Sequence, residues 1–550
     1  MKKISEMTLK EKIGQVLVCG FQGTEYSEEL KTLIEEYKLG NVILFTRNIK
    51  DVKQLHDLNM KIHNEIIKNS GVMPFISIDQ EGGMVTRIMK EATFFPGNMT
   101  ISATQNSEYA KKVGEMMGEE LRALGINMNL APSLDVNNNP QNPVIGVRSY
   151  SDDPVKVAKY GKNYINGLQS KGIIATAKHF PGHGDTNVDS HKSLPTIPHS
   201  KERLDKVELY PFKECLNDTE AIMSAHVFFE AYEQGGMPGT LSRKVITELL
   251  KETLGYKGLI VSDCMEMKAI DATYGAHMGA LMGLKAGLDQ AMVSATYAKQ
   301  IKAFETVENA VLSGEFPEEE LDKKVEKILK LKEKYAPVME EYFFNKNWDE
   351  KKEVLLSEDN KKLASEITDL SLTKVRGNDL YINKKTLVIA TEPFAMTIAE
   401  DELSDRSIVS AIKESGVKVD TQKIVVNITD EEIEKIIEKA LDYEQVLVCT
   451  YNAGAYKNQA KLINLLNNKI ENLYVLSTRS PYDLYQFKAV KNYMCLYEYT
   501  PNSVITLVKY LKQEIKCCGK LPIKLEEPVE VGASVYVGLE EYPQKKTSNI

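Results

Sequence analysis

The segment KHFPGHGDTNVDSH, residues 178–191, concentrates side chains that can exchange protons. Four of the eight histidines in the sequence fall between His179 and His199. Asp189 and His191 lie two residues apart, so in an extended backbone their side chains would point to the same side. A carboxylate beside an imidazole fixes the tautomer of the ring and favours its protonated form. Such a pair can donate a proton to a leaving oxygen, and we favour this acid–base interpretation.

Two other interpretations of the same segment remain open. The loop, bent by Pro181, Gly182 and Gly184, could be a hydrogen-bonded structure that only closes one end of a domain. It could also be a metal site, since His and Asp at short spacing are natural zinc ligands. A metal-dependent barrel hydrolase would usually carry His-x-His at the end of its first strand. The first apolar run here ends in VCGF instead, so no metal is expected.

Asp263 ends the apolar run GLIVSD, residues 258–263, and offers the complementary chemistry. A carboxylate at the end of a buried strand needs hydrogen-bond donors around it to stay ionised. It is therefore a candidate nucleophile. The alternative is that it caps the following helix, because Ser262 and Asp263 precede MEMKAI. Glu266 is a nearby rival carboxylate, about one turn into that predicted helix.

The elements that must position these residues follow from eight short runs that are apolar almost throughout. They lie at residues 15–21, 41–45, 74–79, 126–136, 172–180, 221–226, 258–263 and 290–294. Such runs predict strands buried on both faces of a parallel sheet. Segments with helical periodicity lie between them, so we expect a (β/α)8 TIM barrel over residues 1–335. An open doubly wound sheet is the alternative, but polar residues follow the strand ends all the way round, which favours the barrel.

The pattern changes after Tyr335. Residues 336–380 are charged and helical in pattern, which predicts a helical linker. Five further strand-like runs then occur at residues 386–390, 423–428, 445–450, 473–478 and 492–497. They predict a smaller α/β sandwich domain over residues 381–550. The ends of its strands carry no dense group of carboxylates and histidines, so the chemistry is expected in the first domain.

Several separate stretches together resemble glycoside hydrolase family 3, and within it the β-N-acetylglucosaminidase branch. They are IDQEGGMVTRI (78–88), GINMNLAPSLDVNNNPQNPVIGVRSYSDDP (125–154), KHFPGHGDTNVDSHKSLP (178–195) and GLIVSDCMEM (258–267). STRSPYDL (477–484) and GKLPIKL (519–525) extend a more divergent resemblance into the second half. The resemblance implies a catalytic barrel followed by a C-terminal α/β domain.

The resemblance also implies an activity, that of a retaining exo-β-N-acetylglucosaminidase acting through a covalent glycosyl-enzyme intermediate. Asp263 would be the nucleophile, His191 the general acid/base and Asp189 its orienting partner. The residues implied to hold the terminal sugar are Asp79, Arg87, Arg148, Lys178 and His179. Arg87 and Arg148 have an alternative role as ion-pair partners of Glu81 or Asp135. No cofactor is implied. A family 3 β-glucosidase or β-xylosidase, or a partial phosphorylase, is the alternative function.

Charge and composition narrow the kinds of partner and the cellular compartment that we expect. The net charge is −9 and no stretch gathers Lys and Arg, so neither nucleic acid nor an anionic membrane is expected as a partner. No apolar run approaches the ~20 residues that a membrane span needs, and no signal-peptide core is visible. Seven unpatterned cysteines suit a reducing compartment. We therefore expect a cytoplasmic monomer or homodimer whose substrates are muropeptide or chitin-derived saccharides containing N-acetylglucosamine.

Overall fold

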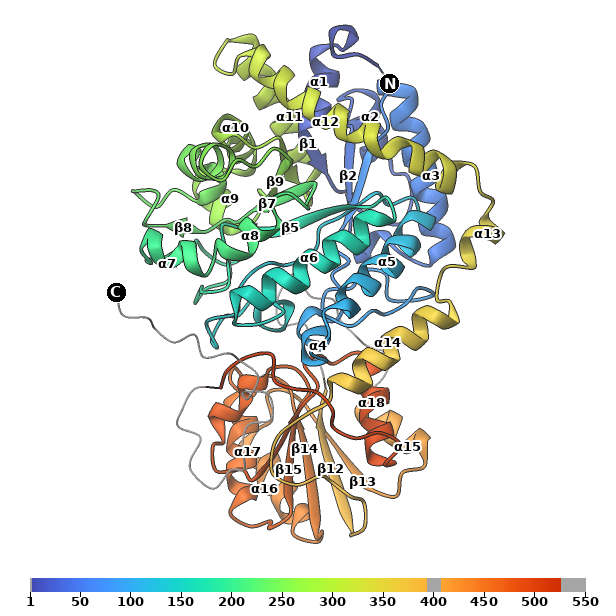
Figure 1. Ribbon diagram of the computed structural model, residues 1–550, viewed down its shortest axis with the longest axis vertical. Helices are drawn as coiled ribbons and strands as arrows, with labels where there is room; N and C mark the ends of the chain where they lie inside the picture. The colour runs from blue at the N-terminus through green and yellow to red at the C-terminus, as the bar shows by residue number, and fades with distance from the viewer. Residues whose placement is uncertain (1, 393–406, 526–550) are drawn as a thin grey trace.

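The computed structural model describes residues 2–392 and 407–525. Within these ranges the chain forms a barrel domain, coloured blue to yellow in Figure 1, and a smaller α/β domain, coloured orange to red. The remaining parts of the predicted C-terminal domain, residues 393–406 and 526–550, lie outside the described residues.

Eight parallel strands form the barrel wall, closed in the order β1-β10-β9-β7-β5-β4-β3-β2. The strands are β1 (Leu17–Cys19), β2 (Asn41–Leu44), β3 (Phe75–Ile78), β4 (Met128–Asn129), β5 (Ile174–Phe180), β7 (Ala221–Ser224), β9 (Leu259–Cys264) and β10 (Gln290–Val293). Each overlaps one of the eight apolar runs, and nearly all of their residues are buried. The predicted barrel is confirmed. The open-sheet alternative is wrong for this domain because β1 pairs with both β2 and β10.

Helices alternate with the strands and cover the barrel (Figure 1). They are α1 (Leu9–Val16), α2 (Glu28–Glu35), α3 (Val52–Ser70), α4 (Asn98–Ala103), α5 (Glu108–Ala123), α6 (Pro154–Ser170), α7 (Lys201–Lys206), α8 (Tyr210–Cys215), the π-helix η5 (Lys244–Thr253), α9 (Lys268–Tyr274), α10 (Ala276–Ala286), α11 (Tyr297–Leu312) and α12 (Glu318–Met339). The sequence pattern explains how they pack. In α5, for example, Val113, Met117 and Leu121 recur every four residues and are buried on one face.

The fourth strand is much shorter than its apolar run. Residues 126–136 predict a long strand, but the regular ladder covers only Met128–Asn129. Pro132 lacks the N–H group that a ladder needs, so regular pairing cannot pass through it. The chain still follows β5, because the Thr176 N–H donates to the Ala131 carbonyl and the Lys178 N–H to the Pro132 carbonyl. The loop after β4 therefore begins beside the end of β5.

The second domain is built on a six-stranded sheet in the order β11-β16-β15-β14-β12-β13. Its strands are β11 (Thr373–Arg376), β12 (Thr386–Thr391), β13 (Asp420–Ile424), β14 (Gln445–Thr450), β15 (Leu473–Ser477) and β16 (Asn492–Cys495). Its helices are α15 (Ile408–Ser415), α16 (Asp430–Ala440), α17 (Lys457–Asn467) and α18 (Pro501–Leu511). Only β11 runs antiparallel to its neighbour. The predicted α/β fold of this domain is confirmed.

Two strands of this sheet differ from the predictions. The run 423–428 predicts a strand, but β13 lies three residues earlier and is largely exposed. It is an edge strand, so it needs no continuous apolar run, and Val425 of that run lies outside it and is half exposed. The segment 336–380, expected to be helical, contains the helices α13 (Trp348–Lys352) and α14 (Glu358–Ser371) but also β11. The sheet therefore starts inside the range predicted as a helical linker.

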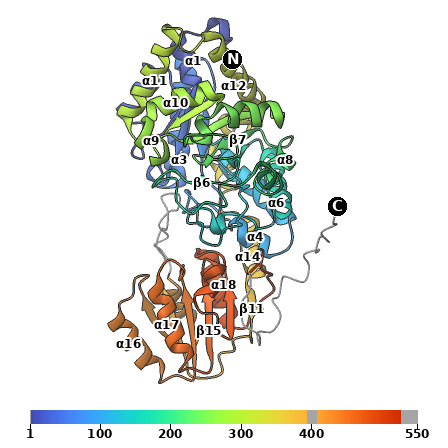
Figure 2. The ribbon, with the colours of Figure 1, turned by 90° about the vertical axis from the view of Figure 1, so that its left-hand side faces the viewer.

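The two domains stack along the long axis of the molecule, as Figure 2 shows from the side. Helix α4 of the barrel packs against α14 at their junction. Polar contacts also cross the junction: the Asn502 side chain donates to the Phe94 carbonyl at 2.7 Å. In residues 2–392 and 407–525, every helix is too short or too polar to cross a membrane.

Candidate active site

A cavity of about 540 Å³ opens at the carboxyl ends of the barrel strands. Its described lining falls within residues 43–295 of the barrel. It brings together seven of the eight residues singled out in the sequence: Asp79, Arg87, Arg148, Lys178, His179, His191 and Asp263. The eighth, Asp189, is 3% exposed and contacts His191. Polar lining residues that the sequence did not assign to the site are Thr46, Arg47, Glu81, His183, Ser190, Cys264, Glu266, Lys268 and Ser294.

The predicted acid–base pair is formed in the structure. His191 Nδ1 lies 2.8 Å from Asp189 Oδ1, and the His191 N–H donates to the same oxygen at 2.9 Å. The two residues lie in a turn closed by the Lys192 N–H, so the expected extended backbone is wrong although the side chains meet. Burial would raise the pKa of Asp189, but the hydrogen bonds from His191 outweigh it and lower that pKa. With Nδ1 occupied by a carboxylate, Nε2 is the ring nitrogen left for the cavity.

The loop that carries this pair is held closely against the strand-four loop. A Cβ on Gly184 would lie 1.8 Å from the Val136 carbonyl oxygen, so only glycine allows this approach. His183 bonds Thr186 Oγ1 through Nδ1 at 2.9 Å and Ser190 Oγ through Nε2 at 3.0 Å. Burial lowers the pKa of His183 to about 4. His183 therefore has the structural role that was one alternative for the whole segment.

Asp263, the predicted nucleophile, lies in β9 one residue before the strand ends. Its Oδ1 accepts a hydrogen bond from the Cys264 N–H at 2.7 Å. Burial would raise the pKa of Asp263, but nearby histidines, His226 first, lower it, so the carboxylate stays ionised. The capping alternative is wrong, because α9 begins at Lys268 with Met267 at its N-cap.

The rival carboxylate, Glu266, has a different surrounding. It precedes α9 instead of lying one turn inside it. Its Oε1 accepts from the backbone N–H groups of Ala295 and Thr296 at 2.7 and 3.0 Å. This oxygen therefore holds the loop after β10, while Asp263 stands nearer to the histidines of the cavity.

The predicted sugar-holding residues form a network of charges across three strands. Lys178 Nζ, in β5, lies 2.8 Å from Asp79 Oδ1 and 2.7 Å from Glu81 Oε1, both after β3. Arg87 reaches Asp79 Oδ2 at 3.6 Å. Because each cation is matched by a carboxylate, the ion pairs restrain these side chains at the cavity wall.

Glu81 is the main residue of this network that the sequence did not assign to the site. Arg148 binds it in a bidentate pair, Nε to Oε2 at 3.0 Å and Nη2 to Oε1 at 2.7 Å. Burial would raise the pKa of Glu81, but Arg148 and Lys178 hold it well below its usual range. The ion-pair alternative for Arg148 is thus present in the structure, and Arg148 still lines the cavity. The Glu81–Gly–Gly sequence directly after a buried strand was the available signal.

His179 is oriented by a second buried carboxylate. Its Nδ1 lies 2.7 Å from Asp135 Oδ2, and Asp135 also accepts from the His183 N–H at 2.6 Å. Burial would raise the pKa of Asp135, but His179 and the other donors lower it to about 2. Asp135 therefore fixes His179 as Asp189 fixes His191, and its position after the fourth apolar run is the signal that pointed to it.

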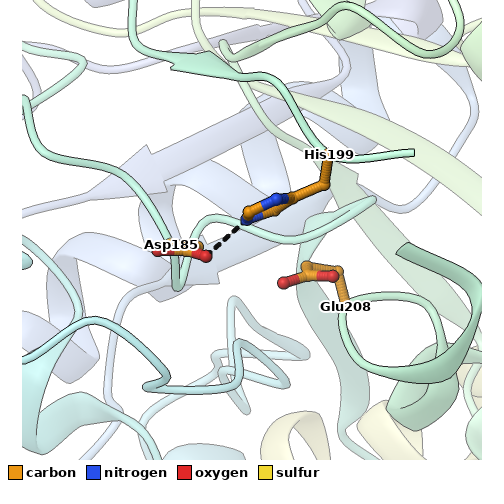
Figure 3. Close-up of side chains that lie close together, drawn as sticks. All are labelled: Asp185, His199 and Glu208. Carbon is orange, nitrogen blue, oxygen red and sulfur yellow. Dashed lines mark hydrogen bonds and ion pairs between the residues drawn. The ribbon is translucent and has the colours of Figure 1, made fainter. Parts of the chain in front are cut away.

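The metal alternative has one geometric candidate in residues 2–392 and 407–525, formed by Asp185, His199 and Glu208 (Figure 3). His199 Nε2 lies 2.6 Å from Asp185 Oδ2. Arg203 holds both oxygens of Glu208, at 2.7 and 2.9 Å, and lies 3.9 Å from Asp185. The group is outside the described cavity lining, and a protein cation already faces both carboxylates. These residues are better explained as contacts that hold the loop after β5 in place than as metal ligands.

Comparisons with known proteins agree with this architecture. Residues 8–331 match the Glycosyl hydrolase family 3 N terminal domain. The chain is 37% identical over 339 residues to beta-hexosaminidase A of Pseudoalteromonas piscicida. The aligned region covers 58% of this chain and 57% of that protein. A beta-hexosaminidase of Photobacterium profundum is 35% identical over 280 residues, 50% of this chain and 81% of that protein.

A solved structure extends the similarity to nearly the whole chain. A glycoside hydrolase family 3 beta-N-acetylglucosaminidase from Paenibacillus sp. str. FPU-7 superposes with a TM-score of 0.88 at 40% sequence identity. The match covers 96% of this chain and 100% of that one. The resemblance seen in the sequence is confirmed, and the chain belongs to glycosyl hydrolase family 3.

Proposed function

We propose that this glycoside hydrolase is a retaining exo-β-N-acetylglucosaminidase that uses Asp263 as nucleophile and His191 as general acid/base. The observation that carries the proposal is the hydrogen-bonded Asp189–His191 pair at the rim of the cavity that also contains Asp263. Most glycosidases use a second carboxylic acid in place of this histidine. Relatives with the same architecture carry the names beta-hexosaminidase and beta-N-acetylglucosaminidase, which supports the same sugar here.

The first half of the reaction forms a covalent intermediate. The Asp263 carboxylate attacks the anomeric carbon of a terminal N-acetylglucosamine while the bond from that carbon to the leaving oxygen breaks. His191 gives its Nε2 proton to this oxygen, so the aglycone departs as an alcohol. Asp189 stabilises the imidazolium before the transfer and keeps Nδ1 protonated afterwards.

The second half regenerates the enzyme. Neutral His191 takes a proton from water at Nε2 as the water oxygen bonds to the anomeric carbon and the bond to Asp263 breaks. Two inversions at the same carbon leave its configuration retained. The network of Asp79, Arg87 and Lys178 holds the sugar hydroxyls through both steps.

For the natural substrates we propose fragments of muropeptides or of chitin that end in β-linked N-acetylglucosamine. The seven cysteines are all free thiols, which supports a reducing compartment such as the cytoplasm. The alternative β-glucosidase and β-xylosidase activities would need the same nucleophile and a different preference at the 2-position of the sugar.

The decisive experiment combines a substrate panel with covalent labelling. We expect the 4-nitrophenyl β-N-acetylglucosaminide to be turned over faster than the glucoside or xyloside. A 5-fluoro-N-acetylglucosaminyl fluoride should attach to Asp263, as read by peptide mass spectrometry. Asp263→Ala should lower kcat by at least about 10³-fold. A label on another residue, or a faster glucoside, would contradict the proposal. Loss of activity in a chelator would favour the metal alternative. Formation of sugar 1-phosphate in phosphate buffer would favour the phosphorylase alternative.

A further inference from the structure

His226 is a buried histidine beside Asp263 that the proposed reaction does not use. It follows β7, which pairs in parallel with β9 so that Ser224 lies opposite Ser262. The residues after these two strands are therefore neighbours at the catalytic rim. His226 is only 1% exposed, so it is not a solvent-facing proton carrier.

Both ring nitrogens of His226 have hydrogen-bond partners. Nε2 lies 3.0 Å from the Cys264 carbonyl oxygen, which has no hydrogen, so Nε2 must donate. Nδ1 lies 2.9 Å from Thr240 Oγ1. Burial lowers the pKa of His226, and the nearby Asp263 carboxylate opposes this shift. Thr240 Oγ1 also donates to the Ala225 carbonyl at 2.9 Å, and the contact to the Cys264 carbonyl requires an Nε2–H on the ring.

The hydrogen bond from His226 Nε2 is made to Cys264, the residue that orients the proposed nucleophile. The Cys264 N–H donates to Asp263 Oδ1 at 2.7 Å, while its carbonyl accepts from His226. Its Sγ accepts from Ser294 Oγ at 2.9 Å. Cys264 is thus held by its N–H, carbonyl and side chain. In residues 2–392 and 407–525, no hydrogen bond to Asp263 Oδ2 is found, so Oδ2 is the oxygen left to attack.

We propose that His226 is a positioning residue for the proposed nucleophile, acting through the Cys264 peptide to aim the carboxylate of Asp263. His226 reaches Asp263 through the Cys264 peptide, whose carbonyl accepts from Nε2 and whose N–H donates to Asp263 Oδ1. Thr240 Oγ1, 2.9 Å from Nδ1, restrains the other side of the ring.

The inference rests on the proposed function, and one pair of variants tests it. His226→Gln keeps a side-chain N–H that can reach the Cys264 carbonyl, whereas His226→Leu removes the donor at similar volume. The readout is the rate of covalent labelling of Asp263 by the 5-fluoro glycosyl fluoride. Fluoride departs without protonation, so this rate reports the attack of the nucleophile and not the action of His191.

We expect His226→Leu to label about 10–100-fold more slowly, with KM for the nitrophenyl substrate within about twofold of wild type. His226→Gln should recover most of the labelling rate. His63 provides a matched control, since it is fully buried in α3 and its Nε2 donates to the Gly125 carbonyl at 2.8 Å, away from the cavity lining. His63→Leu should lower the thermal midpoint and leave the labelling rate of the folded protein unchanged.

Two results would overturn the proposal. One is a wild-type labelling rate in His226→Leu. The other is an equal loss in His226→Gln and His226→Leu that follows the thermal midpoint, as a purely structural histidine would give. If the wild-type protein is labelled at a residue other than Asp263, the proposed function fails instead, and the two failures are distinguished by the same mass spectrum.

Discussion

Three cations and two carboxylates share one side of the cavity, and at the residue scale their proposed role in holding the sugar depends on the balance of these charges. Asp79 and Glu81 face Arg87, Arg148 and Lys178. Every one of these cations is nearly inaccessible to solvent, so each depends on a carboxylate for its stability. Glu81 contributes most to this stabilisation because it forms ion pairs with both Arg148 and Lys178.

Glu81→Gln tests this dependence. Removing one partner of a buried ion network costs about 3–5 kcal/mol of unfolding free energy. We expect a loss of this size in urea denaturation at pH 7, together with a higher KM as Arg148 and Lys178 lose their orientation. Glu358→Gln is the matched control, because Glu358 is almost fully exposed and its surface pair with Lys361 contributes about 1 kcal/mol or less.

The pH dependence gives the same prediction a second readout. The folded-state pKa of Glu81 lies below its unfolded value, so its stabilisation is complete above the ordinary glutamate pKa and is lost as the pH falls through the folded value. Glu81→Gln should therefore lose less stability than wild type between pH 5 and pH 3. Parallel curves for the two proteins would contradict the assigned role of Glu81.

At the scale of elements, the catalytic loop between β5 and β6 (Thr196–Ile197) is tied at both ends. β6 pairs with β8 (Phe228–Phe229), and Asp185 bonds His199 across the base of the loop. The loop contains Asp189 and His191, so its rigidity should determine how well the proposed acid/base is placed. The Asp185–His199–Glu208 group is thus explained by its contacts across the base of this loop.

Asp185→Asn should loosen this loop without unfolding the protein. We expect kcat to fall about 3–10-fold, since a displaced acid/base is less effective, with a loss of unfolding free energy of about 1 kcal/mol or less for this part-exposed pair. Hydrogen exchange of amides 185–193 should become faster. Asp205→Asn, in the neighbouring α7, is the control for removing an exposed carboxylate. An equal fall in kcat in this control would contradict the role of Asp185 in holding the loop.

At the scale of the whole molecule, the second domain supports the barrel loop that carries the proposed sugar-holding residues Asp79 and Arg87. Glu498, after β16, accepts from the Gly97 N–H and from Thr100 Oγ1, each at 2.7 Å. Gly97 packs directly against Gly83, two residues after Glu81. The C-terminal domain therefore stabilises the loop after β3 from outside the described cavity lining.

Glu498→Gln tests this junction through its pH dependence. Burial raises the pKa of Glu498, so its contribution to stability is complete below the ordinary glutamate pKa and is lost as the pH rises through the folded value. The wild-type thermal midpoint should therefore fall more between pH 5 and pH 8 than that of Glu498→Gln, whose amide oxygen can still accept from Gly97 and Thr100. Glu514→Gln, on the exposed surface of the same domain, should behave as wild type.

Local patterns in the sequence were sufficient for the barrel and for most of the cavity. A strand covered on both faces must be apolar along its length, so eight such runs could be read directly. In a parallel barrel all strand carboxyl ends meet at one rim, so Asp263 and Lys178 could be placed together although 85 residues separate them. Edge strands such as β13 escape this pattern because one of their sides faces solvent.

Tertiary structure alone decided which side chains pair and which act. The Asp189–His191 spacing predicted a contact, but a turn and not a strand produces it. The contacts that Glu81, Asp135 and His226 make were established only when the barrel brought β3, β4, β5, β7 and β9 side by side. The balance of buried charges and the tautomer of a buried ring depend on neighbours from distant parts of the chain, and no local pattern of residues encodes them.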